Sequence, residues 1–211
     1  MRNKIFVVGI GPGDKKYITP AALEKILSAK FLLGGRRALK DFATDSQEIF
    51  AITKDLESAI NFIREKILIA DVVVMVSGDP GYYSMLDLIR KNFSQDLIEV
   101  IPSISAMQLA FARLSLSWYD AKLLSFHGRR PTDEDLKFSP QKVLGLLTDS
   151  EFNSATISKI LLELGWNENS NLAICSRLSY PDEKIILTTL AQAVISEPVK
   201  HCILIAGFAA G

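Results

Sequence analysis

The sequence predicts an α/β protein with two α/β domains, a mainly parallel sheet in the first and a mixed sheet in the second. In the first half, short β-branched runs alternate with stretches whose apolar residues recur at helical spacing, such as Leu56, Ile60 and Ile63. This alternation is typical of a parallel sheet covered by helices on both faces. After about Ser117 the pattern becomes less regular. We therefore expect domains at 1–117 and 118–211, each large enough to bury a core.

The elements of the N-terminal domain follow from its apolar runs and helix signals. Strands are expected at 4–10, 30–33, 48–52, 71–76 and 97–101. Helices are expected between and after them at 19–29, 54–68, 81–93 and 104–116. Thr19 can cap the first of these helices, with Pro20 at its first position, because the threonine hydroxyl accepts an unpaired N–H and proline has none to leave unpaired.

The C-terminal domain is expected to begin with a linker and a long loop at 117–140, which includes the acidic run 133–135 as a solvated segment. The remaining elements are a strand at 142–148, a helix at 154–165, strands at 171–178 and 184–190, and a last strand at 201–209. The strands at 171–178 and 184–190 are joined by a short Ser-Tyr-Pro-Asp turn, so they should pair antiparallel.

Composition and charge weigh against several classes of partner. The 24 basic and 24 acidic residues cancel, so no overall field favours nucleic acid or an anionic membrane. The longest apolar run is interrupted by Asp71 and is only as long as a strand, so no membrane span is expected. The first apolar run is too short for a signal peptide, so we expect a cytoplasmic protein. Cys175 and Cys202 are expected to be buried free thiols, and no zinc-ligand spacing is present.

The glycine-rich loop after the first strand, "VVGIGPGD", does not fit a dinucleotide-binding loop. That motif needs G-x-G-x-x-G leading directly into a helix, whereas here the third glycine comes one position early and the helix starts near Thr19. The acidic residue expected after the second strand is replaced by Gly34 and Gly35. A nicotinamide-dependent oxidoreductase is therefore a disfavoured alternative.

Three strand ends carry small, turn-forming residues at what should be one edge of the sheet. They are the glycine loop, "SGDPGYYS" at 77–84 and "IPSIS" at 101–105. Small residues allow a ligand to approach the backbone, and ligands bind at the carboxyl ends of parallel strands. For Asp79, Ser103 and Ser105 the alternative is an ordinary helix cap.

The segments "VVGIGPGD", "VSGDPGYYS" and "VIPSISAMQLAFARL" together resemble the tetrapyrrole methylase family, nearly from end to end of the chain. The resemblance implies two α/β domains with a ligand cleft between them, S-adenosyl-L-methionine as methyl donor, a small-molecule tetrapyrrole substrate and a homodimer. "LLGGRRAL", "SFHGR" and "SRLSYPDEKI" are similar to the branch that methylates carbon 5 of cobalt-precorrin-7 in cobalamin biosynthesis. Relatives with other acceptors, namely uroporphyrinogen, a protein histidine or ribosomal RNA, stay open as alternatives.

Matching motifs assign candidate residues for the methyl donor. These are Pro12, Gly78, Asp79, Tyr82, Ser103, Ile104, Leu147 and His201. For His201 a partly buried histidine at the start of a strand is the alternative. The resemblance also implies that methylation at carbon 15, with its decarboxylation, comes from a separate protein, because this chain ends at Gly211.

The acceptor is expected to bring carboxylates and an electron-rich carbon. Guanidinium groups bind carboxylates through two hydrogen bonds, so we expect Arg36, Arg37 and Arg129, with His127, to contact it, although each arginine could instead be a solvated surface residue. An electron-rich carbon needs no activated nucleophile on the enzyme, and no catalytic residue is identified.

Overall fold

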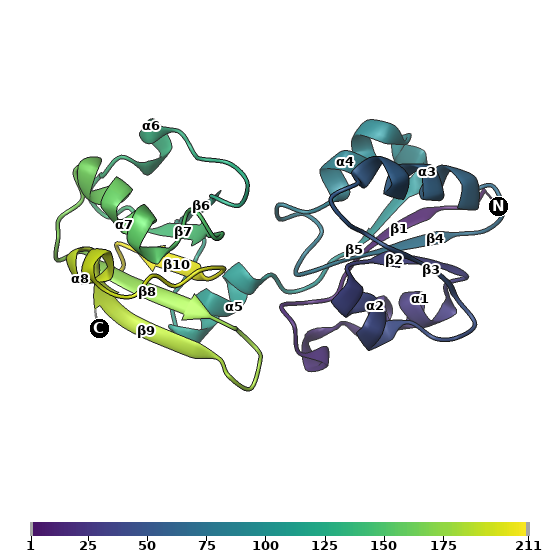
Figure 1. Cartoon of the computed structure of the whole chain (residues 1–211), viewed down its shortest axis with the longest axis horizontal. Helices are drawn as coiled ribbons and strands as arrows, with labels where there is room; N and C mark the ends of the chain where they lie inside the picture. The colour runs from purple at the N-terminus through teal and green to yellow at the C-terminus, as the bar shows by residue number, and fades with distance from the viewer. Residues whose placement is uncertain (1, 210–211) are drawn as a thin grey trace. The chain divides into compact units, whose positions relative to one another are not determined.

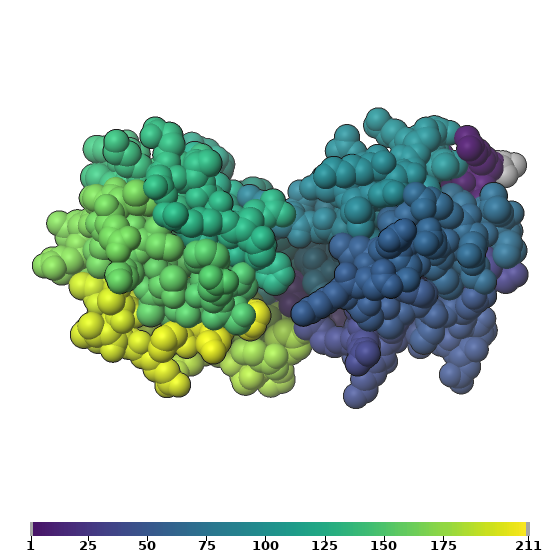
Figure 2. Space-filling view, turned by 45° about the horizontal axis from the view of Figure 1, so that its top comes forward, coloured from purple at the N-terminus to yellow at the C-terminus, as the bar shows by residue number. Residues whose placement is uncertain are grey.

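The computed structural model describes residues 2–209. The chain divides into two compact units, one ending at Ser105 and one beginning at Ala106 (Figure 1). Figure 2 shows them as space-filling surfaces, the first in purple to teal and most of the second in green to yellow. The domain bounds expected from the sequence, 1–117 and 118–211, stay a prediction, because these units are defined by which residues lie near one another and not by independent folding.

The N-terminal unit is built on a five-stranded parallel sheet in the order β3-β2-β4-β1-β5. Its strands are β1 (Ile5–Gly9), β2 (Phe31–Gly34), β3 (Glu48–Ala51), β4 (Val72–Val76) and β5 (Ile98–Ile101). The central β1 pairs with β4 from Ile5 opposite Val72 and with β5 from Ile5 opposite Ile98. Every residue of β4 is buried, which explains its continuous apolar sequence, since a central parallel strand is covered on both faces.

Helices cover both faces of this sheet, α3 and α4 on one and α1 and α2 on the other (Figure 1). Their bounds are α1 (Pro20–Ser28), α2 (Arg36–Phe42), α3 (Leu56–Lys66) and α4 (Leu86–Asn92), with 3₁₀ turns η1 (Lys15–Tyr17) and η2 (Gln95–Leu97). Alternate strand residues serve the two layers: Val74 packs with Ile63 of α3, whereas Met75 packs with Ile26 of α1. The mainly parallel sheet expected from the sequence is confirmed.

Two helix starts show how local chemistry decides the boundaries. The Thr19 hydroxyl accepts the N–H of Ala22, with Pro20 at the first position of α1 as expected. In contrast, α4 begins at Leu86, not at 81, and Asp79 is not its cap. The Asp79 carboxylate instead accepts the N–H of Gly81 within a turn, so the helix-cap alternative for Asp79 is wrong.

The C-terminal unit contains a mixed five-stranded sheet in the order β6-β7-β10-β8-β9. Its strands are β6 (Lys122–Ser125), β7 (Leu144–Leu147), β8 (Asn171–Ser176), β9 (Lys184–Thr189) and β10 (Ile203–Ala206). Only β6 and β7 pair parallel, and the expected antiparallel hairpin is confirmed as β8–β9. Its helices are α5 (Ala106–Arg113), α6 (Asp133–Leu136), α7 (Ser154–Glu163) and α8 (Leu190–Ile195).

The linker and long loop expected at 117–140 contain β6 and α6, so that expectation is wrong. Both elements are four residues long, too short to leave a periodic apolar signal. The helix α6 is capped by Thr132, and the Asp135 carboxylate lies 2.6 Å from the Lys122 ammonium of β6. The acidic run 133–135 therefore forms a capped helical turn.

The C-terminal sheet has different neighbours on its two faces. One face packs on α7 and α8 through a cluster that includes Leu146, Leu161 and Leu190. The other face packs on α5 at Gly145, where an added Cβ would lie 2.7 Å from the Met107 sulfur. Cys175 and Cys202 are buried and free, as expected. None of the helices within residues 2–209 has the length and apolar character required to cross a bilayer.

Candidate functional site

The predicted site residues of the N-terminal unit gather at the carboxyl ends of its parallel strands. We call the loops after β1, β4 and β5 (residues 10–14, 77–85 and 102–105) the N-terminal edge. All six donor-site candidates of this unit lie in them: Pro12, Gly78, Asp79, Tyr82, Ser103 and Ile104. Because the strands are parallel and β1 lies between β4 and β5, the three loops leave the sheet side by side.

Glycines bring the first two loops into direct contact. Gly11 and Gly78 exchange backbone hydrogen bonds, with the Gly78 nitrogen 2.8 Å from the Gly11 oxygen, and both have positive φ angles of 78° and 70°. Gly9 lies still closer: a Cβ there would be 2.7 Å from the Gly78 oxygen and 2.7 Å from the Ser103 Cβ. The glycines are therefore required by close approach of the loops. They do not open a helix, since α1 begins only at Pro20.

Asp79 links the second loop to the third. One carboxylate oxygen accepts the Gly81 N–H at 2.8 Å, and the other accepts the Ser103 N–H at 2.9 Å. Asp79 thus fixes the position of Ser103. This link between the loops after β4 and β5 could not be predicted from the sequence motif.

Two buried hydroxyls at this edge have no hydrogen-bond partner within the described residues, those of Tyr82 and Ser103. Buried polar groups are nearly always paired, so two such groups at one edge of the sheet point to a polar ligand. Burial raises the pKa of Tyr82 far above its usual value, so its hydroxyl stays protonated and can donate. S-adenosylmethionine, with its amino-acid group, ribose and adenine, offers partners of this kind, and the residues present fit it.

The remaining N-terminal candidates are more exposed. Ile104 is 38% exposed and Pro12 is half-buried, so both present apolar surface at the edge. Arg36 and Arg37 are the first residues of α2, just after β2, and are exposed. Since β2 adjoins β4, both arginines lie at the same edge of the sheet as the loops.

The C-terminal candidates also gather at one edge of their sheet. There β6, β7 and β8 end and β9 and β10 begin; we call residues 125–129, 147–149, 176–184 and 200–203 the C-terminal edge. Leu147 ends β7 opposite Ile203 of β10. His127 and Arg129 follow β6, and His201 precedes β10. Candidates from three distant parts of the sequence thus lie at one edge of the sheet.

Thr148 and Asp149 fasten this edge, and sequence analysis missed both. The Thr148 hydroxyl accepts the Cys202 N–H at 2.8 Å and donates to the Cys202 carbonyl at 2.9 Å. The Asp149 carboxylate accepts three backbone N–H groups, those of Gly128, Glu151 and Phe152, at 2.8–3.1 Å. These hydrogen bonds hold the pKa of Asp149 below its usual value, with those from Gly128 and Phe152 contributing most. The charge of His127 makes a smaller contribution in the same direction.

His201 is held through its backbone, whose N–H donates to the Asp149 carbonyl at 3.4 Å. Its φ is 49°, a left-handed conformation that is uncommon for residues other than glycine. The side chain is exposed and precedes the strand, so the alternative of a partly buried strand-start histidine is wrong.

The β8–β9 turn at the same edge is locked by an ion pair. The Glu183 carboxylate lies 2.6 Å from Arg113 Nε of α5 and also accepts the Ser179 N–H at 2.6 Å. Arg177 and Ser179 in this turn have positive φ angles of 53° and 73°. Backbone in such a conformation persists where its surroundings hold it in place. Here Glu183 holds the turn at Ser179.

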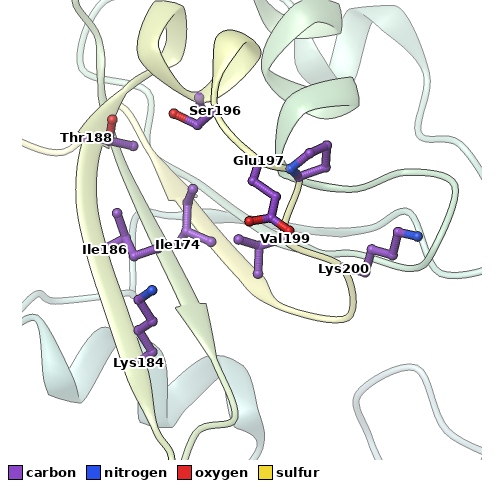
Figure 3. A pocket seen from close by; sticks show the side chains of 10 residues that line it. Ile174, Lys184, Ile186, Thr188, Ser196, Glu197, Val199 and Lys200 are labelled. Atoms are coloured by element: carbon purple, nitrogen blue, oxygen red, sulfur yellow. The ribbon is translucent and has the colours of Figure 1, made fainter.

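A pocket of about 600 Å³ in the C-terminal unit reaches the C-terminal edge only at Lys184 and Lys200. Figure 3 shows it between Lys184, Ile186 and Thr188 of β9 and the segment from Ser196 to Lys200. None of the candidate residues lines it. It is a groove on a face of the sheet, whereas the candidates gather at its edge.

The known proteins to which this chain is similar belong to one family. A sequence model of the tetrapyrrole (corrin/porphyrin) methylases matches residues 4–194. The chain is 30% identical to the probable cobalt-precorrin-7 C(5)-methyltransferase of Methanocaldococcus jannaschii over 89% of this chain and 90% of that protein. It is 31% identical to the cobalt-precorrin-7 C(5)-methyltransferase of Salmonella typhimurium over 85% of this chain and 87% of that protein.

Among solved structures, the fold is similar to the uroporphyrin-III C-methyltransferase of Thermus thermophilus in complex with S-adenosyl homocysteine. The TM-score is 0.77 at 20% identity, covering 97% of this chain and 92% of that one. Members of the matched family use S-adenosyl-L-methionine as methyl donor. The chain therefore belongs to the tetrapyrrole (corrin/porphyrin) methylases and is an S-adenosyl-L-methionine-dependent methyltransferase.

Proposed function

We propose that this chain transfers a methyl group from S-adenosyl-L-methionine to carbon 5 of cobalt-precorrin-7 in cobalamin biosynthesis. The observation that carries the proposal is that both relatives described above, each aligned over at least 85% of this chain, are named for this same reaction. The motifs at 32–39, 125–129 and 176–185, which are similar to that branch, support the same acceptor.

We assign donor binding first to the N-terminal edge. S-adenosylmethionine, when bound, supplies a methyl group activated by its sulfonium. The unpartnered hydroxyls of Tyr82 and Ser103 form hydrogen bonds to its polar groups, and Asp79 holds Ser103 in place. Gly78 allows the close approach of the loops, and Pro12 and Ile104 contribute apolar surface that excludes water. On the family motifs alone, we also assign Leu147 and His201 of the C-terminal unit to donor binding.

We assign the acceptor carboxylates to Arg36, Arg37 and Arg129, with His127. Guanidinium groups recognise carboxylates through paired hydrogen bonds and keep their charge at all working pH values. Arg36→Ala and Arg129→Ala should each raise KM for the tetrapyrrole while the Kd for S-adenosyl homocysteine stays unchanged. Unchanged tetrapyrrole kinetics in both variants would contradict the assignment.

Mass spectrometry of cobalt-precorrin-7 incubated with the protein and methyl-labelled S-adenosylmethionine tests the proposal. One labelled methyl on the macrocycle, without loss of carbon dioxide, supports the assigned reaction. No label, in a sample that binds S-adenosyl homocysteine in calorimetry, contradicts the acceptor and redirects the search to metal-free precorrins and uroporphyrinogen. The homodimer, the cytoplasmic location and the separate enzyme for carbon 15 stay predictions; light scattering tests the first.

A further inference from the structure

Tyr83, at the N-terminal edge, differs from the other residues of its unit in its backbone conformation. Its φ is 50°, and within residues 2–105 it is the only residue other than glycine with a positive φ. This left-handed conformation is an outlier for a bulky side chain, because the Cβ crowds the following carbonyl oxygen. Conformations of this kind cost free energy and gather at functional sites, where the surroundings hold them.

Hydrogen bonds on both sides of Tyr83 hold this conformation. Before it, the Tyr82 N–H donates to the Asp79 carbonyl at 3.2 Å. After it, the Ser84 hydroxyl donates to the Pro80 carbonyl and accepts a backbone N–H from the start of α4 at 3.1 Å. The loop therefore fixes the backbone of Tyr83 through its own groups.

The loop presents the side chain of Tyr83 outward. Tyr83 is 43% exposed, and its ring packs edge-to-face on the ring of Tyr82, with centroids 4.9 Å apart and planes at 72°. The Tyr82 hydroxyl, in contrast, is buried and is assigned above to the methyl donor. An exposed aromatic ring that is already held in place binds a flat apolar surface at a small cost in conformational entropy.

We propose that the Tyr83 ring stacks on the conjugated face of the tetrapyrrole acceptor. This inference rests on the proposed function and deepens it by naming a residue that binds the macrocycle itself. Arg36 and Arg37, assigned above to the acceptor carboxylates, follow β2, and β2 adjoins β4, which leads into the loop of Tyr83. An aromatic surface and cationic groups thus lie at one edge of one sheet, and a flat polycarboxylate offers partners to both.

Titration of the protein with cobalt-precorrin-7, followed by its visible absorbance, tests the inference. Tyr83→Asn removes the ring but keeps a residue that tolerates the left-handed conformation. The Kd and KM for cobalt-precorrin-7 should each rise about tenfold, which corresponds to about 1.4 kcal/mol. Tyr83→Phe keeps the ring and should recover most of this loss. The Kd for S-adenosyl homocysteine and the melting temperature should stay those of the wild type in both variants.

Tyr119→Asn is the matched control, because Tyr119 is 83% exposed and lies in the C-terminal unit outside the C-terminal edge. It should leave the affinity for cobalt-precorrin-7 unchanged. An equal loss of affinity in Tyr119→Asn and Tyr83→Asn would overturn the inference.

Three further outcomes separate the inference from the proposed function. Wild-type affinity for cobalt-precorrin-7 in Tyr83→Asn overturns the inference alone. Weaker binding of S-adenosyl homocysteine in that variant also overturns it, since the ring then contacts the donor or only holds the loop. A wild type that binds cobalt-precorrin-7 without methylating it overturns the proposed function, while the Tyr83 variants still decide the inference. A wild type that does not bind cobalt-precorrin-7 overturns both.

Discussion

The two edges achieve the same task, a rigid rim of loops at the end of a sheet, by different means. At the N-terminal edge the loops touch through backbone, at Gly9, Gly11 and Gly78, and side chains would prevent the contact. At the C-terminal edge the loops are tied by side chains, chiefly those of Thr148 and Asp149. Contact through backbone tolerates no added atom, whereas contact through side chains can relax when one partner changes.

Gly9→Ala is the most direct way to break the N-terminal edge. The added Cβ would meet the Gly78 carbonyl and the Pro80 ring at 2.7 and 2.8 Å, and the backbone cannot rotate away. We expect a loss of about 3 kcal/mol in the free energy of unfolding, at the upper end for overpacked sites. We also expect the affinity for the methyl donor to fall by at least about tenfold. Urea unfolding and calorimetry measure the two effects.

Gly35→Ala is the matched control for this substitution. Gly35 is exposed, has no atom within 4 Å of an added Cβ and caps α2 without a side-chain hydrogen bond. Because glycine is a better N-cap than alanine, its unfolding free energy should fall, but by no more than about 1 kcal/mol. Equal destabilisation by both substitutions would contradict the role of close approach at Gly9.

Asp149→Asn tests the side-chain fastening of the C-terminal edge. We expect a loss of about 1–2 kcal/mol at pH 7, because an amide is a weaker acceptor than a carboxylate for N–H groups. Both tryptophans, Trp118 and Trp166, belong to the C-terminal unit, so their fluorescence reports its unfolding. The same variant also gives a pH dependence.

The pKa of Asp149 is lowered in the folded protein, so its stabilisation is fully present above the unfolded pKa of about 4. It is lost as the pH falls through the lower, folded pKa. The difference in unfolding free energy between wild type and Asp149→Asn should therefore be largest near neutral pH and narrow below about pH 4. A difference that widens in acid would contradict the assigned hydrogen bonds.

Gly145→Ala sharpens the comparison by placing a Cβ against side chains. The added atom would lie 2.7 Å from the Met107 sulfur and 2.8 Å from Leu123 Cδ2, both in flexible side chains, and 3.1 Å from Phe111 Cε2. We expect about 1 kcal/mol of destabilisation, at the lower end for overpacking, and unchanged donor binding. A loss as large as that of Gly9→Ala would show that atom distance, not backbone rigidity, sets the effect.

Tyr82→Phe should change stability in the opposite direction. Its hydroxyl is buried and has no hydrogen-bond partner within residues 2–209, so its removal should raise the free energy of unfolding of the ligand-free protein by up to about 1 kcal/mol. Affinity for S-adenosyl homocysteine should fall in the same variant. Destabilisation with unaltered affinity would remove Tyr82 from the donor site.

The sequence predicted most of the N-terminal unit because its strands are continuous apolar runs separated by capped helices. It missed α2, which has no side-chain cap, and α8, whose first residue was assigned to the preceding strand. It also missed β6 and α6, which are too short for periodicity. Gly9, Gly78 and Ser103 could be placed at the N-terminal edge since small residues at strand ends are visible in the sequence. Asp149 could not, because its role depends on the order β6-β7-β10, which brings residues 128 and 201 beside it.

The buried thiols give the molecule an internal reporter of its own opening. Cys175 faces the same side of the sheet as its partner Ile203, so Cys202, the next residue along, faces the opposite side; the sheet itself keeps the two sulfurs from forming a disulfide. Burial raises the pKa of Cys175 to about 12 and that of Cys202 to about 11, so the folded protein holds almost no thiolate. Alkylation therefore proceeds only when the C-terminal unit opens, so the alkylation rate measures how often this unit opens. The N-terminal unit has no cysteine, so its opening does not contribute to the rate.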